Sequence, residues 1–289
     1  MKTSGVSLVI GADGLIGRAL VEHLEHVGTP VIETTRRKGE LSERKLFLDL
    51  AEDISDWYPP SQVSTAYLYA AGSSLRRCRA EPAQTARVNV ENTVALAKKL
   101  VSNGTFVIFP STNLVFDGTV PYRNADAPLC PITEYGRQKA LAERELLALG
   151  NLVSVVRMTK VLEQQIPLFK GWMQSFENCQ LIHPFSDMVV APVSLGLAIR
   201  VFDGVASARL PGLLQVSGQQ DVTYAQIGRH IAKKMGVDCT LVEAKSWRES
   251  GLDLEAVPNH TTLDTSRLRA ELGIELMDVW TTIDTMLGL

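Results

Sequence analysis

Short apolar runs and amphipathic segments alternate along the first half of the chain. The runs end at glycine or polar residues and are too short for buried helices, so they indicate strands of a parallel sheet. They stand at residues 6–10, 31–35, 45–50, 65–72, 105–112 and 152–158. Segments with apolar residues at helical spacing separate several of them, most clearly at 86–104. This alternation predicts an α/β fold with a doubly wound parallel sheet, the Rossmann architecture.

A glycine-rich turn follows the first of these runs. It has the spacing G-x-x-G-x-x-G and stands between a strand and an amphipathic helix that ends near Gly28. In this setting the backbone can approach a pyrophosphate closely, and the helix N-terminus offers unpaired N–H donors. The motif therefore favours dinucleotide binding over a turn that binds nothing. The residues predicted to contact the cofactor here are Gly11, Asp13, Gly14, Leu15, Ile16 and Gly17.

The end of the second predicted strand bears on the choice between NAD and NADP. An acidic residue there would bind a ribose hydroxyl, whereas arginine accommodates a 2′-phosphate. Thr35 stands where the acid is expected, and Glu33 is expected to point elsewhere. The cations Arg36, Arg37 and Lys38 follow Thr35 directly. Such a run is commonly only a solvated loop, but here it favours NADP(H), contacted by Arg36 and Arg37, with NAD(H) still possible.

Further candidate residues stand at the carboxyl ends of other predicted strands. Doubly wound sheets bind their ligands outside this edge. The residues at these ends are Asp49, Leu50, Ala70, Ala71, Gly72, Ser111 and Thr112. Those from Asp49 to Gly72 are predicted to complete the cofactor site.

The next predicted helix contains "EYGRQK", with Tyr135 and Lys139 four residues apart. Side chains at this spacing are neighbours on one helical face. A phenol has an ordinary pKa near 10, and a nearby ammonium together with an oxidised nicotinamide is expected to lower it. Tyr135 is therefore predicted to exchange a proton with a substrate carbonyl oxygen held by Thr112. Lys139 is also predicted to bind the nicotinamide ribose.

Composition and charge limit the classes of protein to consider. The 289 residues are 45% hydrophobic and 21% charged, with a net charge of −3, which is ordinary for a globular protein and argues against a nucleic-acid binder. No apolar run approaches the roughly 18 residues of a membrane span, and the short run near the N-terminus suits a strand better than a signal peptide. The four cysteines lack C-x-x-C spacing, so neither a metal site nor a disulfide framework is expected. We expect a cytoplasmic protein that binds a small molecule and neither nucleic acid nor membrane.

The glycine turn, the "PST" at residues 110–112 and the Y-x-x-x-K motif together resemble the extended short-chain dehydrogenase/reductases. The stretch "STNLVFDGTVPYRNADAPLCPITEYGRQK", residues 111–139, is most similar to the dTDP-4-dehydrorhamnose reductase family of sugar-nucleotide reductases. This resemblance implies NAD(P)H as the cofactor and a catalytic triad of Thr112, Tyr135 and Lys139. It also implies a Rossmann domain over residues 1–160. The remainder, 161–289, is implied to be mainly a substrate lobe, with some segments returning to the Rossmann domain.

The sugar-facing positions depart from the family pattern. Asn113 and Leu114 stand where an Asp-Tyr pair is expected, and Asn124 replaces an acid. In the second half, Met188 and Val193 replace a glutamine and a threonine. The cofactor loop and the triad are retained. The changes therefore predict a reductase for a different 4-keto sugar nucleotide, or for a substrate of another kind.

Four residues are candidates for substrate contacts. Ser111 and Asn113 stand beside the predicted catalytic threonine, and Lys170 and His183 stand in the predicted lobe. A histidine in such a segment is more commonly a hydrogen-bonded structural residue, and a structural role is therefore the alternative to a substrate contact for His183.

Three functions are compatible with these motifs. The favoured one is reduction of a keto group on a nucleotide-linked 4-keto-6-deoxy sugar or a similar small molecule. An epimerase or dehydratase on the same fold would need extra acid–base groups near the tyrosine, and no Asp-Glu pair follows Thr112. A catalytically silent NADP-binding regulatory subunit would have no use for the triad, although the altered Asn113-Leu114 pair fits it.

A homodimer is also predicted. In the proteins that this chain resembles, the helix with the Tyr–Lys pair and the helix before it commonly form a four-helix interface. Apolar residues suited to that interface are Val90, Val94, Ala97, Leu141 and Leu146. The same residues would equally suit a core that faces the sheet.

Overall fold

Seven parallel strands form the central sheet of the computed structural model, which describes residues 5–70, 72–162 and 166–288. In spatial order they are β10 (Gly212–Val216), β6 (Val153–Met158), β5 (Phe106–Thr112), β4 (Val63–Leu68), β1 (Val6–Ile10), β2 (Val31–Thr35) and β3 (Lys45–Phe47). At the centre, Leu8 of β1 pairs with Ile32 of β2 on one side and with Ala66 of β4 on the other. The strand order reverses between β1 and β4, which is the switch point of a doubly wound sheet. The predicted fold class is confirmed.

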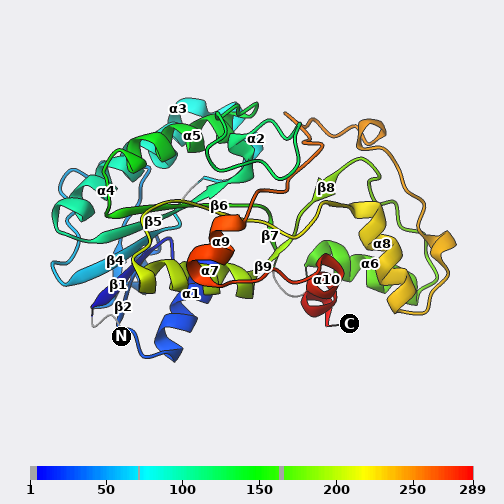
Figure 1. The fold of residues 1–289 in the computed structure, drawn as a ribbon, viewed down its shortest axis with the longest axis horizontal. Coiled ribbons are helices and arrows are strands. Elements are labelled where there is room, and N and C mark those ends of the chain that lie inside the picture. The colour runs from blue at the N-terminus through cyan, green and yellow to red at the C-terminus, as the bar shows by residue number, and fades with distance from the viewer. Residues whose placement is uncertain (1–4, 71, 163–165, 289) are drawn as a thin grey trace.

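Helices cover both faces of this sheet (Figure 1). The helices on one face are α1 (Leu15–His26), α7 (Leu195–Ala208) and α9 (Ser266–Leu272), and those on the other are α4 (Thr93–Ser102) and α5 (Glu134–Leu147). The alternation of strand side chains decides which core each residue joins. Val9 packs with α1 and α7, whereas its neighbours Leu8 and Ile10 pack with α4 and α5. Because both faces are covered, a ligand reaches the sheet at the ends of its strands.

Three helices form a lobe to one side of the sheet (Figure 1). They are α6 (Pro167–Glu177), α8 (Tyr224–Lys234) and α10 (Val279–Leu287), and they share one apolar core. Two short strand pairs accompany them, β7 (Val161–Leu162) with β9 (Val193–Ser194) and β8 (Val189–Val190) with β11 (Val222–Thr223).

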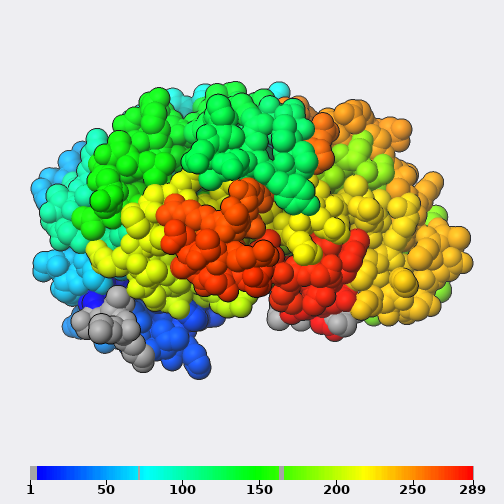
Figure 2. All heavy atoms as spheres, viewed as in Figure 1, coloured from blue at the N-terminus to red at the C-terminus, as the bar shows by residue number. Residues whose placement is uncertain are grey.

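Segments from the second half of the chain also return to the sheet. β10 forms an edge beside β6, and α7 and α9 cover one face. On the face that Figure 2 shows, the orange-red residues of α9 lie directly beside green and yellow-green segments. Near the site, the backbone N–H of His260 donates to the Gly118 carbonyl at 2.9 Å, which joins the returning chain to the loop after β5. The division into two domains at residue 160 remains a prediction.

The segment between β4 and β5 is less regular than the sequence indicated. The helix predicted over 86–104 is present as the π-helical turn η2 (Arg87–Asn92) followed directly by α4. Two short helices that were not predicted, α2 (Leu75–Ala80) and α3 (Pro82–Ala86), precede it. Short 3₁₀ turns elsewhere are η1 (Lys38–Glu40), η3 (Asn113–Val115), η4 (Cys239–Leu241) and η5 (Trp247–Glu249). A π-turn of this kind commonly marks a functional region.

Most of the apolar residues considered for a dimer interface are buried within a single chain. The four in the core beneath α4 and α5 are Val90, Val94, Ala97 and Leu146. Leu141 is 40% exposed. These four side chains already pack against the sheet, so the homodimer stays a prediction that light scattering would test. Within the described residues, no helix has both the length and the apolar character needed to cross a membrane.

Candidate active site

The glycine turn brings β1, α1 and β4 into close contact. Gly11 has φ +82°, a left-handed conformation that favours glycine, and a Cβ there would lie 2.7 Å from the Ala70 nitrogen. Gly17 in α1 lies so close to the Gly11 carbonyl that a methyl group would overlap it. The helix begins at Leu15, and no side chain at its N-cap, Gly14, accepts from the first turn. These N–H groups can therefore bind a phosphate, and the turn fits the pyrophosphate of a dinucleotide.

A cavity of about 460 Å³, which we call the cofactor cavity, opens beside this turn. The predicted cofactor contacts that line it are Gly11, Asp13, Gly14, Arg36, Asp49, Leu50, Ala70 and Gly72. Leu15, Ile16 and Gly17 form the first turn of α1 next to it. Ala71 lies outside the described residues. The cavity lies at the carboxyl ends of β1, β2 and β4, around the switch point where doubly wound sheets bind dinucleotides, so the residues present fit a nicotinamide cofactor.

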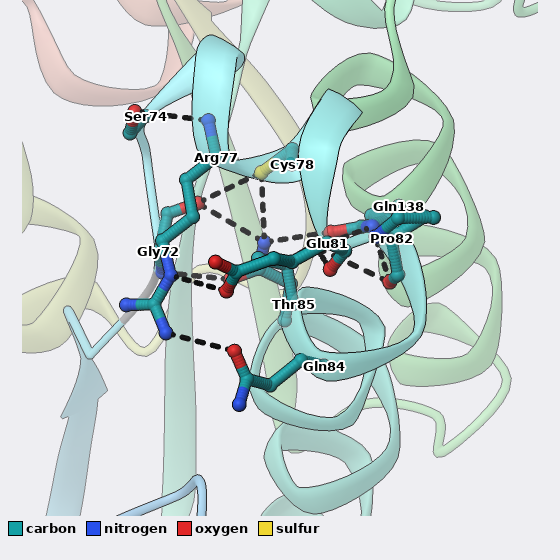
Figure 3. Close-up of polar contacts among 10 residues, drawn as sticks. Gly72, Ser74, Arg77, Cys78, Glu81, Pro82, Gln84, Thr85 and Gln138 are labelled. Atoms are coloured by element: carbon teal, nitrogen blue, oxygen red, sulfur yellow. Dashed lines mark hydrogen bonds and ion pairs between the residues drawn. The ribbon is translucent and has the colours of Figure 1, made fainter.

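Other residues of the cofactor cavity were missed by the sequence reasoning. Tyr69 follows β4, Gln84 and Val88 stand before α4, and Arg77 belongs to α2. Figure 3 shows Arg77 reaching toward Gln84, to which its Nη2 donates at 3.0 Å, while its Nε donates to Glu81 at 3.0 Å. The sequence feature that could have identified Gln84 and Val88 is their four-residue spacing, which places both side chains on one helical face.

The three cations after β2 have different environments. Arg36 lines the cofactor cavity and has no polar side-chain partner among the described residues. Arg37 turns away and donates from Nη1 to Glu40 at 3.0 Å. Lys38 lies over the Phe47 ring, 5.1 Å from its centre. Of the two arginines predicted to contact the cofactor, the structure therefore brings only Arg36 to the cavity.

Asn89, in the π-turn, holds the entry to α2 in place. Its side chain accepts the Gly72 N–H at 2.8 Å and donates to the Gly72 carbonyl at 3.1 Å and to Gln138 Oε1 at 2.8 Å. The Cys78 thiol donates to the same carbonyl at 3.2 Å (Figure 3). Since Gln138 belongs to α5, this network joins the wall of the cofactor cavity to the helix that carries Tyr135.

The first turn of α5 lies directly against η3, the turn that follows β5. Gly136 is so close to the Leu114 carbonyl that a Cβ would overlap it. Thr112 ends β5 and accepts the Leu114 N–H at 3.2 Å. The contact between α5 and η3 thus brings Tyr135 beside the strand end that carries Thr112. The catalytic roles of both residues remain predictions.

Lys139, one turn further along α5, is 2% exposed and donates from Nζ to the Pro110 carbonyl at 2.6 Å. Burial lowers the pKa of Lys139 to about 7, although the Glu143 carboxylate opposes this. Burial also raises the pKa of Tyr135 well above its ordinary value, and the Cys78 thiol adds to that rise. Lys139 alone therefore does not lower the pKa of Tyr135, and the lowering predicted from the sequence, which also invoked an oxidised nicotinamide, stays a prediction. In this interior the desolvation of each group outweighs any attraction between them.

Ser111 and Asn113 flank Thr112 at the end of β5. Thr112 Oγ1 lies 3.5 Å from Asn113 Oδ1, a long hydrogen bond. Ser111 Oγ is buried and has no hydrogen-bond partner in the described part of the chain. Both residues are close enough to the triad for the substrate contacts predicted from the sequence.

Lys170 and His183 lie apart from the triad region, in the lobe. Lys170 is exposed on α6, and His183 Nδ1 lies 3.1 Å from Glu243 Oε2. Neither lines the cofactor cavity or the second cavity beside α2. Their substrate contacts remain predictions. The described residues contain no group of three His, Cys, Asp or Glu side chains that could hold a metal ion.

The second cavity, of about 660 Å³, is separated from the cofactor cavity by α2. Arg76 and Arg79 line it opposite residues 252–256. Arg79 pairs with the exposed Asp253 at 2.9 Å, whereas Arg76 has no polar side-chain partner in the part of the chain described. Glu255 joins this cavity to α5, because its Oε1 accepts the N–H of the first residue of that helix at 2.8 Å.

Known proteins resemble this chain along almost its whole length. The family model of the RmlD substrate binding domain matches residues 6–288. The chain is 26% identical over 279 residues to a probable low-salt glycan biosynthesis reductase of Haloferax volcanii, covering 92% of each chain. It is also 26% identical over 290 residues to methionine adenosyltransferase 2 subunit beta of Danio rerio, covering 93% of this chain and 85% of that one.

Solved structures support the same relationship at the level of the fold. The dTDP-4-dehydrorhamnose reductase of Bacillus anthracis, solved in complex with NADP, has a TM-score of 0.81 to this chain and 18% identity, covering 98% and 99% of the two chains. The resemblance inferred from the motifs is confirmed, and with it the expected enzyme class, an NAD(P)-dependent oxidoreductase. The chain belongs to the RmlD substrate binding domain family.

Proposed function

We propose that this protein reduces a keto group on a nucleotide-linked sugar, with NADPH as the preferred reductant. A 4-keto-6-deoxy sugar is the first candidate for the substrate. The observation that carries the proposal is the packing of α5 on η3: Gly136, next to Tyr135, lies against the Leu114 carbonyl, and the Leu114 N–H donates to Thr112 at the carboxyl end of β5. Ligands of doubly wound sheets bind at this edge.

Tyr135 is the proposed proton donor. Reduction adds a hydride to the carbonyl carbon and a proton to the carbonyl oxygen. The dihydronicotinamide supplies the hydride when it is bound. Because burial raises the pKa of Tyr135, its phenol keeps that proton at neutral pH until negative charge develops on the oxygen. Thr112 donates a hydrogen bond to the same oxygen and holds it toward Tyr135.

Lys139 is proposed to bind the ribose next to the nicotinamide. Its Nζ lies at the carboxyl half of β5, where one of its three donors is used by the Pro110 carbonyl. Lys139 is not among the residues that line the cofactor cavity, but Nζ makes no other hydrogen bond to the described residues. A ribose that reaches it would occupy the remaining donors and stabilise the charged form that burial disfavours.

Arg36 is proposed to set the preference for NADP(H). Its guanidinium lines the cofactor cavity at the end of β2 and is not engaged by any carboxylate described here. Arginine at this position suits the 2′-phosphate that distinguishes NADP from NAD.

The second cavity is proposed to hold the nucleotide-linked part of the substrate. The unpaired guanidinium of Arg76 suits a diphosphate. Glu255 Oε2 is buried without a hydrogen-bond partner among the described residues, and suits a sugar hydroxyl. Glu255 is bonded to the first residue of α5, so this cavity adjoins the turn that carries Tyr135.

A screen for NADPH oxidation tests the proposal. The compounds are dTDP-, GDP- and UDP-linked 4-keto-6-deoxy sugars, and the variants are Tyr135→Phe and Thr112→Val. We expect Tyr135→Phe to keep its NADPH affinity and lose roughly 10²- to 10⁴-fold in turnover, the range for one positioned acid. Thr112→Val should lower turnover with little effect on NADPH binding. Tyr58→Phe, which removes the same hydroxyl from a residue that is 72% exposed, is the matched control.

Two results would contradict the proposal in different ways. Unchanged turnover in Tyr135→Phe would show that another group donates the proton. Tight NADPH binding without reduction of any keto compound would instead favour a catalytically silent NADP-binding subunit.

A further inference from the structure

The Asp13 carboxylate lies against the end of β2, the strand end that carries an acidic residue in NAD-binding sheets. Thr35 stands at that strand end, and its Oγ1 donates to Asp13 Oδ2 at 2.7 Å. The Thr35 oxygen also accepts the Arg37 N–H at 3.0 Å, which leaves its proton directed at Asp13. Asp13, Thr35 and Arg36 all line the cofactor cavity. A carboxylate is therefore present at the ribose end of this cavity, although it comes from the glycine turn and not from β2.

We propose that Asp13 accepts hydrogen bonds from the adenosine ribose of the cofactor, and that Asp13 and Arg36 set the choice of cofactor in opposite directions. The inference rests on the cofactor site proposed above. A carboxylate binds a free 2′-hydroxyl and repels a 2′-phosphate, whereas a guanidinium attracts the phosphate. The chain therefore binds NAD(H) as well as NADP(H), and its preference for NADP(H) is smaller than Arg36 alone would produce.

The charge of Asp13 is only partly balanced by its neighbours. Lys45 Nζ lies 3.6 Å from Asp13 Oδ1, but it is closer to Glu40, at 3.1 Å, and lies 3.7 Å from Glu33. Arg37 also pairs with Glu40, at 3.0 Å, so two cations face three carboxylates and the cluster keeps a net negative charge. The Asp13 side chain is 27% exposed, so a ribose in the cavity has access to it.

A purely structural role for Asp13 makes a different prediction. The hydrogen bond to Thr35 connects the glycine turn to β2. Loss of this bond alone would lower the stability of the protein and weaken the binding of both cofactors equally. The ratio of the NADPH and NADH affinities distinguishes a structural role from a binding role. Only a group that contacts the 2′ position of the ribose changes one affinity relative to the other.

The test measures the Kd of NADPH and of NADH by quenching of protein fluorescence at one ionic strength. Asp13→Asn keeps an oxygen for the Thr35 hydroxyl and removes the charge. We expect this variant to bind NADH more weakly and NADPH more tightly, so that the ratio of the two affinities rises by about tenfold in favour of NADPH. Arg36→Ala should shift the ratio the opposite way. Glu33→Gln is the matched control, because it removes a charge from the same Lys45 cluster but lies outside the cavity lining.

The melting temperature of each variant confirms that it is folded, and Asp13→Ser replaces Asp13→Asn if the latter unfolds. An unchanged ratio in a folded Asp13 variant overturns the inference and leaves Asp13 a structural role. An equal change in Glu33→Gln also overturns it, since the effect would then be one of general charge. If the unmodified protein binds neither dinucleotide, the proposed function fails together with the inference.

Discussion

Lys139 carries its ammonium into the interior between α5 and β5. Nζ donates to the Pro110 carbonyl and lies 3.7 Å from the centre of the Phe109 ring, whose face attracts a cation. These contacts replace only part of the hydration that the charge loses, so burial still lowers the pKa to about 7. A shift of this size on a residue beside a strand-end site is typical of functional positions.

Lys139→Met should therefore change how stability depends on pH. An unfolded lysine titrates near pH 10.4. Between pH 7 and 10 the unfolded chain binds the proton and the folded chain does not, so this group makes the unmodified protein more stable as pH rises, by at most about 1.4 kcal/mol per pH unit. Below pH 7 the full cost of the buried charge is present. Relative to the unmodified protein, the variant should be most stable at pH 6 and lose that advantage toward pH 10.

Urea unfolding at several pH values between 6 and 10 measures this difference. The exposed Lys98→Met on α4 serves as the control and should show no such trend. A stability difference between Lys139→Met and the unmodified protein that does not vary with pH would mean that Lys139 titrates normally in the folded state.

At the scale of elements, the packing of α1 on the glycine turn shapes the cofactor cavity. Gly17 is in the first turn of α1, and a Cβ there would overlap the Gly11 carbonyl and lie only 3.0 Å from Ala12 Cα. The obstacle is backbone, which cannot rotate away as a side chain would. The absence of a side chain at Gly17 thus sets the distance between helix and turn.

Gly17→Ala should push α1 away from the turn. We expect a loss of about 1–3 kcal/mol in the free energy of unfolding, as for other overpacked sites, and a higher Kd for NADPH because the N–H groups of the helix move away from the pyrophosphate. Gly171→Ala, in the middle of α6 with no atom near the added methyl, should instead be neutral or gain up to about 1 kcal/mol. Equal effects of the two substitutions on NADPH binding would refute this account.

At the scale of the molecule, one buried arginine connects several segments. Arg157 of β6 pairs with Glu143 of α5 at 2.8 Å, and its Nη1 donates to the Ala125 carbonyl at 2.9 Å and to Gln215 Oε1 of β10 at 3.3 Å. The amide of Gln215 donates in turn to the Asp264 carbonyl at 3.0 Å. This network ties the sheet to the helix of the triad, to the loop after β5 and to the returning C-terminal segment.

Glu143→Ala should lower the free energy of unfolding by about 3–5 kcal/mol, because it leaves the charge of Arg157 buried without its partner. Glu145→Ala, two residues along the same helix, breaks an exposed pair with Arg144 and should change stability by less than about 1 kcal/mol. Chemical denaturation of both variants measures the contrast. A small effect of Glu143→Ala would mean that water or another group satisfies Arg157.

Local patterns in the sequence were sufficient for six of the seven strands and for about half of the residues that line the cofactor cavity. Strands β1, β2, β5 and β6 have the predicted positions within one residue, because short apolar runs between polar boundaries have few other stable arrangements. The glycine spacing similarly restricts the turn at Gly11, since backbone approach there excludes a side chain. The short helices α2 and α3 and the π-form of η2 were not predicted, and Asn89 of η2 bonds to Gly72 and Gln138, which are distant in sequence.

The sequence by itself determined the first six strands of the sheet, the glycine turn and the candidate triad, all of which depend on local spacing along the chain. Only the tertiary structure decided where the charges act. It turned Arg37 toward Glu40, brought Asp13 to Thr35, and buried Lys139. The pKa of a group and the partner of a charge depend on desolvation and on neighbours from other elements, which spacing along a chain does not specify.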